Sequence, residues 1–313
     1  MFKNNQESFG RFDFVKNIGL FGGFSVLCVV LSLVYLTIKG INYGIDFKGG
    51  TEIQVKFNKS VSIDHVRDTV EGLDLGEVGV QGIGGDGAEY IIRFVGQKGV
   101  TDKETNEKLN ASIARVKENL TTKLAADGVE FRRVDTVGPQ LGGELKRSGF
   151  LAVFYCLLVI LIYVAMRFDY KFAPGAVVCL FHDAVITLAI FNLVGKEVNV
   201  PILAAILSLI GFSLNDTIVV FDRIRETEHE HKSKGYAFII NKSINDMLGR
   251  TLITSGTVFV SSLSLYLFAG GVVSDIAFAI CIGIFFGTYS SIYVAAPLIL
   301  VMEKLKVNQR ATA

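Results

Sequence analysis

Six long apolar runs constrain the fold of this 313-residue chain more than any other feature of its sequence. Each run is close to the roughly 20 residues that an α-helix needs to cross a bilayer core. Half of all residues are hydrophobic, which is more than one soluble core would require. The runs cover residues 18–38, 148–166, 172–194, 200–221, 252–268 and 276–301. The sequence therefore predicts a polytopic α-helical membrane protein with six transmembrane helices.

The first apolar run is expected to be a retained helix rather than a cleaved leader. It follows the basic residues Lys3, Arg11 and Lys16, as a signal peptide would. However, a signal peptide has a shorter apolar region that ends at a small-residue cleavage site, and this run shows neither property. We therefore interpret 18–38 as the first transmembrane helix.

Basic residues beside the spans predict the orientation, because positively charged short loops are retained in the cytoplasm. With a cytoplasmic N-terminus, the cytoplasmic side would hold Lys3, Arg11, Lys16, Arg167, Lys171, Arg223, Arg225, Lys232, Lys234, Lys242, Arg250, Lys304, Lys306 and Arg310. The short external loops would hold only Lys196. The predicted organisation is a cytoplasmic segment at 1–17, a transmembrane helix at 18–38, an external domain at 39–147, five helices within 148–302 with a cytoplasmic loop at 222–250, and a cytoplasmic tail at 303–313.

The external segment has the periodicities of a small α+β domain. Residues alternate as in a strand at 51–57, 77–83, 90–95 and 129–137, and apolar residues recur at helical spacing at 63–73 and 101–126. The turn-rich residues 84–87 predict a hairpin between the second and third strands. The order is βαββαβ, which predicts a ferredoxin-like extracytoplasmic domain.

Charged groups inside spans are the first candidates for chemistry, because each costs about 2.5–3.5 kcal/mol at a helix centre on insertion scales. Asp216 lies in the fourth span, Asp183 lies in the third beside His182, and Arg250 begins the fifth. Asp216 and Arg250 enter from the same side, so they are expected to meet and to offset each other's desolvation. Such a pair either fixes helix packing permanently or holds a carboxyl that changes protonation during transport.

His182 has two possible roles of its own. An unperturbed imidazole titrates near pH ~6.5, so this side chain could share a proton within the membrane. Alternatively, it is a structural group that is satisfied by a neighbouring helix.

A polar stripe is predicted on the fifth span. Its members recur at steps of four, three and four residues and are Arg250, Thr254, Thr257 and Ser261. One helix face is therefore polar for about three turns. This face would line a hydrated path or meet a partner helix. Alternatively, its hydroxyls only form hydrogen bonds between helices or to carbonyl oxygens of their own helix. Asn215 belongs to a similar small and polar face beside Asp216, for which close packing is the alternative.

Small residues repeat every four positions along the sixth span. They are Ala279, Gly283, Gly287, Ser291 and Ala295. A ridge of this kind lets helix backbones approach closely, so we predict a packing role for Gly283 and Gly287. The spacing leaves open whether the neighbour belongs to this chain or to another subunit.

Several functional classes are disfavoured by composition and motifs. A net charge of +1 with scattered basic residues argues against a nucleic-acid partner. The four cysteines all lie in apolar runs, which is typical of small buried side chains rather than of metal ligands or disulfides. No glycine-rich segment ends in Lys-Ser or Lys-Thr, so ATP is not the expected energy source.

Four short segments carry motifs specific enough to compare with known families. The first, at 44–51, follows the first span and contains Gly44, Asp46, Phe47, Gly49 and Gly50. The others are 137–140, which contains Pro139, and 210–226 and 250–255. Their order agrees with the spacing of the spans along nearly the whole chain. Together they resemble the motifs of the SecD/SecF family, within the resistance-nodulation-division superfamily.

This resemblance implies a half-transporter of the bacterial cytoplasmic (inner) membrane that pairs with SecD beside the SecYEG channel. It implies that the assembly draws exported, unfolded polypeptides outward at the expense of the proton gradient, without hydrolytic chemistry or a cofactor. The family's proton-linked acid corresponds to Asp216 and its basic partner to Arg250, while Asp183 lies in a similar His-Asp segment. Whether sodium ions rather than protons drive the assembly stays open.

Two other functions also stay open. One is small-molecule efflux, although such transporters of this superfamily usually join two halves in one chain and have far larger external domains. The other is a structural scaffold of the translocon, in which the buried charges would be passive.

Overall fold

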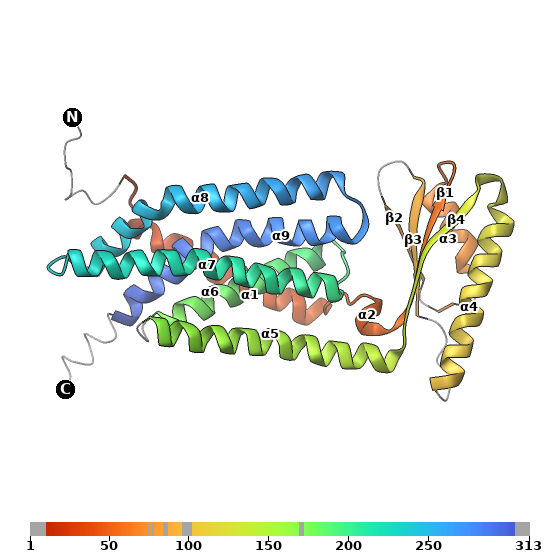
Figure 1. Cartoon of the computed structure of the whole chain (residues 1–313), viewed down its shortest axis with the longest axis horizontal. Helices are drawn as coiled ribbons and strands as arrows, with labels where there is room; N and C mark the ends of the chain where they lie inside the picture. Colours follow the sequence, from red (N-terminus) through yellow and green to blue (C-terminus); the bar gives the residue numbers. More distant parts are fainter. Residues whose placement is uncertain are drawn as a thin grey trace.

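The computed structural model describes residues 11–303 except 74, 77, 84–86, 96–101 and 169–171. These residues form a bundle of long helices and a smaller α+β domain attached to one end of it (Figure 1). Lys3, Lys171, Lys304, Lys306 and Arg310, which contributed to the predicted charge asymmetry, lie outside the described residues.

Six helices in the described part are long and apolar enough to cross a membrane, as predicted. They are α1 (Ile18–Lys39), α5 (Pro139–Arg167), α6 (Ala173–Leu193), α7 (Val200–Glu230), α8 (Tyr236–Phe268) and α9 (Gly271–Ser290). A 3₁₀ turn at Val15–Asn17 precedes α1, and a π-helical turn at Ser291–Ala295 continues α9. Because α6, α7 and α9 contact one another extensively, they form the centre of the bundle.

Several helices are longer than the apolar runs that predict the spans. Most of the segment that was predicted as a loop, 222–250, is helix, and only 231–235 connects α7 to α8. The helices continue because one face stays buried where the other becomes polar, as at Ile224 on α7 and at Ile240 and Ile244 on α8. Similarly, α5 begins at Pro139, a residue that favours the first turn of a helix.

The α+β domain has the predicted βαββαβ order. Its elements are β1 (Gly50–Phe57), α3 (Ile63–Glu71), β2 (Val78–Ile83), β3 (Glu89–Phe94), α4 (Asp102–Lys123) and β4 (Val129–Val137), with a 3₁₀ turn at Ala125–Asp127. The strands pair in the order β2-β3-β1-β4, and every pairing is antiparallel. Part of the predicted hairpin turn, 84–86, lies outside the described residues.

The core of the domain lies between the sheet and its two helices. Ile53, Val55 and Phe57 alternate along β1, and all three are buried together with Val66 of α3 and Leu120 of α4. In Figure 1, α3 and α4 lie on the side of the sheet away from the bundle. The sheet therefore stands between these helices and the membrane helices.

The motif after α1 forms the joint between the domain and the bundle. Its short helix α2 (Ile45–Lys48) buries Phe47 in the core of the bundle. The Gly44 amide donates to the Val198 carbonyl at 2.7 Å, and the Val200 amide donates to Asp46 Oδ2 at 2.9 Å. These contacts fix α2 to the loop before α7.

Two glycines of the joint have positive φ angles and lie close to the backbone of other elements. Gly50 has φ +142°, and a Cβ there would lie 2.7 Å from the Phe94 carbonyl oxygen. Gly49 has φ +76°, and its amide nitrogen would lie 3.0 Å from a Cβ placed on Gly142 of α5. The two glycines therefore let β1, β3 and the first turns of α5 converge.

An ion-pair network connects the sheet to the loop between α6 and α7. The Arg93 guanidinium of β3 lies 2.7 Å from Glu52 Oε2 and 3.4 Å from Glu197 Oε2. In the same region Lys196 pairs with Asp275 on α9. Burial raises the pKa of Glu197, and the charge of Arg93 opposes that rise only in part.

Glu197→Gln is expected to raise the melting temperature as the pH rises. Because the pKa of Glu197 is higher in the folded chain than in the unfolded one, its ionisation disfavours folding increasingly above pH ~4.3. The glutamine removes this titration and keeps a side-chain oxygen beside Arg93. Unfolding scans in detergent should give equal melting temperatures near pH ~4 and a gain of roughly 1–3 °C near pH ~7.5. Glu71→Gln, an exposed site on α3, is the matched control; a loss of stability at Glu197→Gln near neutral pH would contradict the expectation.

Candidate ion-coupling site

A buried carboxylate joins the three central helices. Asp183 of α6 is fully buried, and its Oδ2 accepts hydrogen bonds from Ser213 Oγ of α7 at 2.5 Å and from Ser290 Oγ of α9 at 2.9 Å. The cluster extends to Cys179, whose Sγ lies 3.0 Å from Ser290 Oγ and 3.6 Å from Thr217 Oγ1. Hydroxyl donors thus compensate part of the desolvation of Asp183.

Glycines on α9 allow the close approach that builds this cluster. A Cβ on Gly287 would lie 3.4 Å from Ser213 Cβ and 3.5 Å from Asp183 Oδ2. A Cβ on Gly283 would lie 2.0 Å from Leu209 Cδ2. The neighbours of the predicted small-residue ridge therefore belong to α6 and α7 of the same chain.

His182 takes part in the same polar cluster. Its Nδ1 lies 2.8 Å from Asp183 Oδ1, and its ring stacks on Tyr289, with 6.4 Å between the ring centroids. The other ring nitrogen, Nε2, is buried without a hydrogen-bond partner among the described residues. Tyr289 in turn donates to the Phe21 carbonyl of α1 at 2.6 Å. This arrangement connects Asp183 to α1 through two aromatic rings.

The second buried carboxylate, Asp216, faces α8. It is 4% exposed, and its Oδ2 accepts a hydrogen bond from Ser255 Oγ at 2.9 Å. Asp216 lies three residues after Ser213 and one before Thr217, which places all three on one side of α7. The helix α7 therefore carries one hydrogen-bond donor to Asp183, Ser213, and also the second carboxylate, Asp216.

The predicted contact between Asp216 and Arg250 is not formed. Arg250 is exposed on α8, and no hydrogen bond or ion pair joins it to Asp216 among the described residues. Its positive charge still acts on Asp216 electrostatically. The expectation rested on position along the two spans, but the rotation of α8 turns Ser255, rather than Arg250, toward the carboxylate.

The predicted polar stripe on α8 lies largely on the outside of the chain. Thr254, Thr257 and Ser261 donate to carbonyl oxygens of their own helix at 3.0, 2.8 and 2.9 Å. Asn215 is also exposed, and no side-chain hydrogen bond joins it to Asp216 within the described residues. The hydroxyls are therefore satisfied locally, as the back-bonding interpretation expects, and the stripe remains open to a neighbour.

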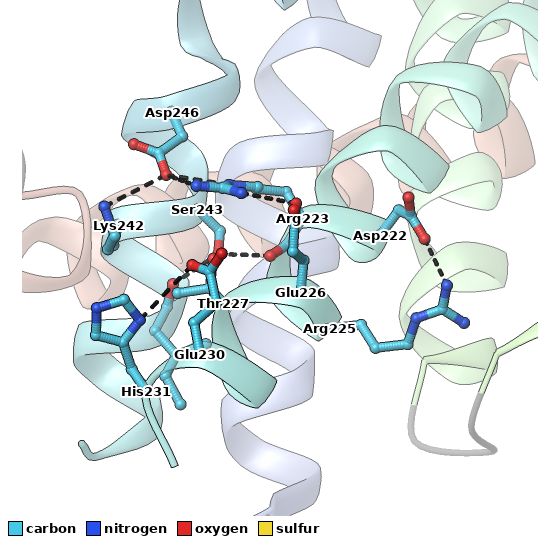
Figure 2. Close-up of polar contacts among 11 residues, drawn as sticks. Asp222, Arg223, Arg225, Glu226, Thr227, Glu230, His231, Lys242, Ser243 and Asp246 are labelled. Carbon is cyan, nitrogen blue, oxygen red and sulfur yellow. Dashed lines mark hydrogen bonds and ion pairs between the residues drawn. The ribbon is translucent and has the colours of Figure 1, made fainter. Parts of the chain in front are cut away.

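A cavity of about 340 Å³ reaches Arg250 from the end of the bundle opposite the α+β domain. Its charged lining consists of Arg167, Asp222, Arg223, Glu226 and Arg250. Figure 2 shows Arg223 between two acids, with its guanidinium 2.6 Å from Asp246 Oδ2 and 2.6 Å from Glu226 Oε2. These ion pairs line a polar mouth that leads from this end of the bundle to Arg250.

The sequence predicts both acids and places His182 beside Asp183, but it does not predict their hydroxyl partners. Ser213, Ser255 and Ser290 are the hydroxyl donors, and each lies on a different helix from the carboxylate that it contacts. A local signal exists only for Ser290, which follows Gly287 by one helical turn on the small-residue ridge. Small hydroxyl residues beside such a ridge are therefore candidate hydrogen-bond donors to an intramembrane acid.

The fold and the site define a class of protein: a six-span α-helical membrane protein with one α+β domain and carboxylates buried between its helices. Two family models match the chain: the C-terminal part of the protein export membrane proteins SecD/SecF at residues 116–305, and the SecD/SecF GG motif at 34–61. The chain belongs to the SecD/SecF family.

Relatives of similar length support this assignment. The protein translocase subunit SecF of Calditerrivibrio nitroreducens is 41% identical over 94% of this chain and 95% of the relative. That of Magnetococcus marinus is 44% identical over 89% and 88%. The solved structure of SecDF from Thermus thermophilus, described as a translocon-associated membrane protein, matches with a TM-score of 0.79 and 32% identity over 97% of this chain. The chain spans only 40% of that SecDF chain.

Proposed function

We propose that this chain is the SecF-type subunit of the bacterial Sec protein translocase and that it couples an ion gradient to protein export. The carboxylates buried between α6, α7, α8 and α9 carry this proposal. Such groups are expensive in a membrane, and they mark ion pathways more often than they serve stability. A carboxyl whose hydration changes between two conformations binds a proton in one of them and releases it in the other.

The coupling acid in this proposal is Asp216. Only one serine hydroxyl bonds to its carboxylate among the described residues, whereas Asp183 has two serine partners and His182. Asp216 also faces α8, whose Arg250 borders the polar cavity. A movement of α8 would therefore change the hydration of Asp216 more readily than that of Asp183. We assign Asp183 to a supporting ion site within the rigid centre of the bundle.

The partner of this chain is proposed to be SecD. An exposed polar surface on a membrane helix is unfavourable against lipid, and α8 exposes Arg250, Thr257 and Ser261, with Thr254 half-buried beside them. A second half-transporter would cover it. The solved SecDF chain, of which this chain spans 40%, is consistent with such a covering half. We also propose that the pair acts beside SecYEG on unfolded exported polypeptides, without hydrolytic chemistry of its own.

Export in inverted membrane vesicles tests the proposed function. Vesicles are prepared from cells that contain or lack the chain, and import of a secretory precursor is measured before and after an ionophore collapses the gradient. The gradient-dependent part of import is expected to require the chain. Equal gradient dependence in both vesicle preparations would contradict the proposal. Replacing the proton gradient with a sodium gradient in the same vesicles identifies the coupling ion.

The proposed orientation has both ends of the chain in the cytoplasm. It rests on the distribution of basic residues, including Arg223, Arg225 and Lys234 on one side and Lys196 on the other. A reporter fused after Gly96, which lies outside the described residues, is expected to be active outside the cytoplasm. One fused after Lys234 is expected to be active inside. Activity of the two reporters on the same side would exclude this topology.

A further inference from the structure

An apolar groove runs along the membrane surface of the bundle at the end that carries the α+β domain. It has a volume of about 800 Å³ and lies between α5 and α6, and residues of α2 and the start of α7 complete its lining. Its apolar walls include Phe47, Phe150, Phe154, Leu157, Phe181 and Leu188. We call it the α5–α6 groove. Its volume is within the range of about 300–1,000 Å³ that is common for small-molecule sites.

Two basic residues stand at the mouth of this groove. Lys146 and Arg147 lie on α5 just before its apolar run, and both line the groove. The Lys146 ammonium lies 4.2 Å from the centroid of the Tyr43 ring, which holds it at the mouth by a cation–π contact. No carboxylate among the described residues pairs with either side chain. Two uncompensated positive charges therefore face the level of the lipid headgroups.

The depth of the groove matches one leaflet of a bilayer. The α5 residues that line it, Phe150, Val153, Phe154 and Leu157, recur on one helix face. From Arg147 to Leu157 the helix rises roughly 15 Å, which is half of a hydrocarbon core of about 30 Å. An acyl chain whose headgroup sits at Arg147 would therefore extend along the groove to its inner end.

We propose that the α5–α6 groove binds an anionic phospholipid from the leaflet on the side of the α+β domain. Lys146 and Arg147 bind the phosphate, for which a guanidinium offers a matching fork of donors. The aromatic and aliphatic walls hold an acyl chain. A helix of a partner protein fits less well, because it would have to place acidic side chains at the mouth. The polar stripe that favours a protein neighbour lies on α8, at the opposite edge of the bundle from α5 (Figure 1).

Tryptophan fluorescence tests the proposal, because the chain contains no Trp. Phe154→Trp places a single reporter in the groove, and Val159→Trp places one on a lipid-exposed face of α5 outside it. Each variant is reconstituted, alone and in complex with SecD, in phosphatidylcholine vesicles with a small fraction of brominated phosphatidylglycerol or brominated phosphatidylcholine. In the Phe154→Trp variant, quenching by the anionic lipid is expected to be half-maximal at a roughly tenfold lower fraction than quenching by the neutral lipid. The Val159→Trp variant should show no such preference.

Charge variants identify the headgroup contact. Lys146→Gln with Arg147→Gln should abolish the preference measured by Phe154→Trp. Arg115→Gln with Lys123→Gln removes the same charge from exposed positions on α4 and should leave the preference unchanged. Equal quenching by both lipids would overturn the proposal, because the groove would then be ordinary lipid-facing surface. Quenching that is present in the chain alone and lost in the complex would also overturn it, because a protein would then fill the groove.

Discussion

Cells whose only copy of the chain carries Asp216→Asn are expected to lose gradient-driven protein export while the protein still folds and inserts. Asparagine keeps the size of the side chain, and its carbonyl oxygen can accept the hydrogen bond of Ser255. The change removes only the group that binds and releases the ion. Stability should therefore stay within about 1 kcal/mol of the parent. Export is measured as the rate of precursor processing in a pulse-chase experiment, with the gradient intact and collapsed.

Glu230→Gln is the matched control for this variant. Glu230 is the last residue of the same helix, and among the described residues its exposed carboxylate has only a long contact, 3.9 Å, with His231 Nδ1. The same change from carboxylate to amide should leave export nearly unchanged there. Full gradient-dependent export by Asp216→Asn would show that this carboxyl is structural, as a scaffold function would require.

Gly287→Leu is expected to destabilise the chain by about 3 kcal/mol or more, because it overpacks the core and breaks buried hydrogen bonds. Its side chain would enter the cluster in which Ser213 and Ser290 donate to Asp183. Gly287→Ala should be tolerated far better, since its Cβ would meet Ser213 at 3.4 Å. Thermal unfolding in detergent measures both.

Gly23→Leu is the control, because no atom of the described residues lies within 4 Å of a Cβ at this position on α1. A melting temperature of Gly287→Leu equal to that of the parent would show that α9 can move away without loss. The ridge packs inside the chain, so the primary effect should be on the chain's own stability. Weaker assembly with a partner would follow only from that loss.

Much of the fold could be predicted because its signals are local. The length of the apolar runs gave the six spans, and alternation within β1 and β4 gave the strands of the α+β domain. The end of α7 and the start of α8 could not be predicted from the length of the apolar runs, because both helices continue beyond those runs as amphipathic helices. Their buried faces are small, and exposed ion pairs such as Arg223–Asp246 make the sequence there resemble a loop.

The site could be predicted only in part, for a related reason. The desolvation of a charge depends on its depth in the membrane, and the position of a residue along a span gives that depth directly. Asp183 and Asp216 could therefore be predicted. Hydrogen-bond partners depend on how each helix rotates about its axis, which is decided by packing against several others. Ser255 faces Asp216 and Arg250 does not because α8 buries Thr251, Ser255 and Ser262. No local pattern encodes that rotation.

Ion flux through reconstituted vesicles tests the central proposal most directly. The parent chain and Asp216→Asn are each reconstituted with SecD and the translocon, with a pH-sensitive dye trapped inside and an exported polypeptide supplied. We expect the parent to dissipate an imposed proton gradient, or a sodium gradient if sodium is the coupling ion, and Asp216→Asn to leak no faster than vesicles without protein. Equal flux through both complexes would contradict the proposed coupling role of Asp216.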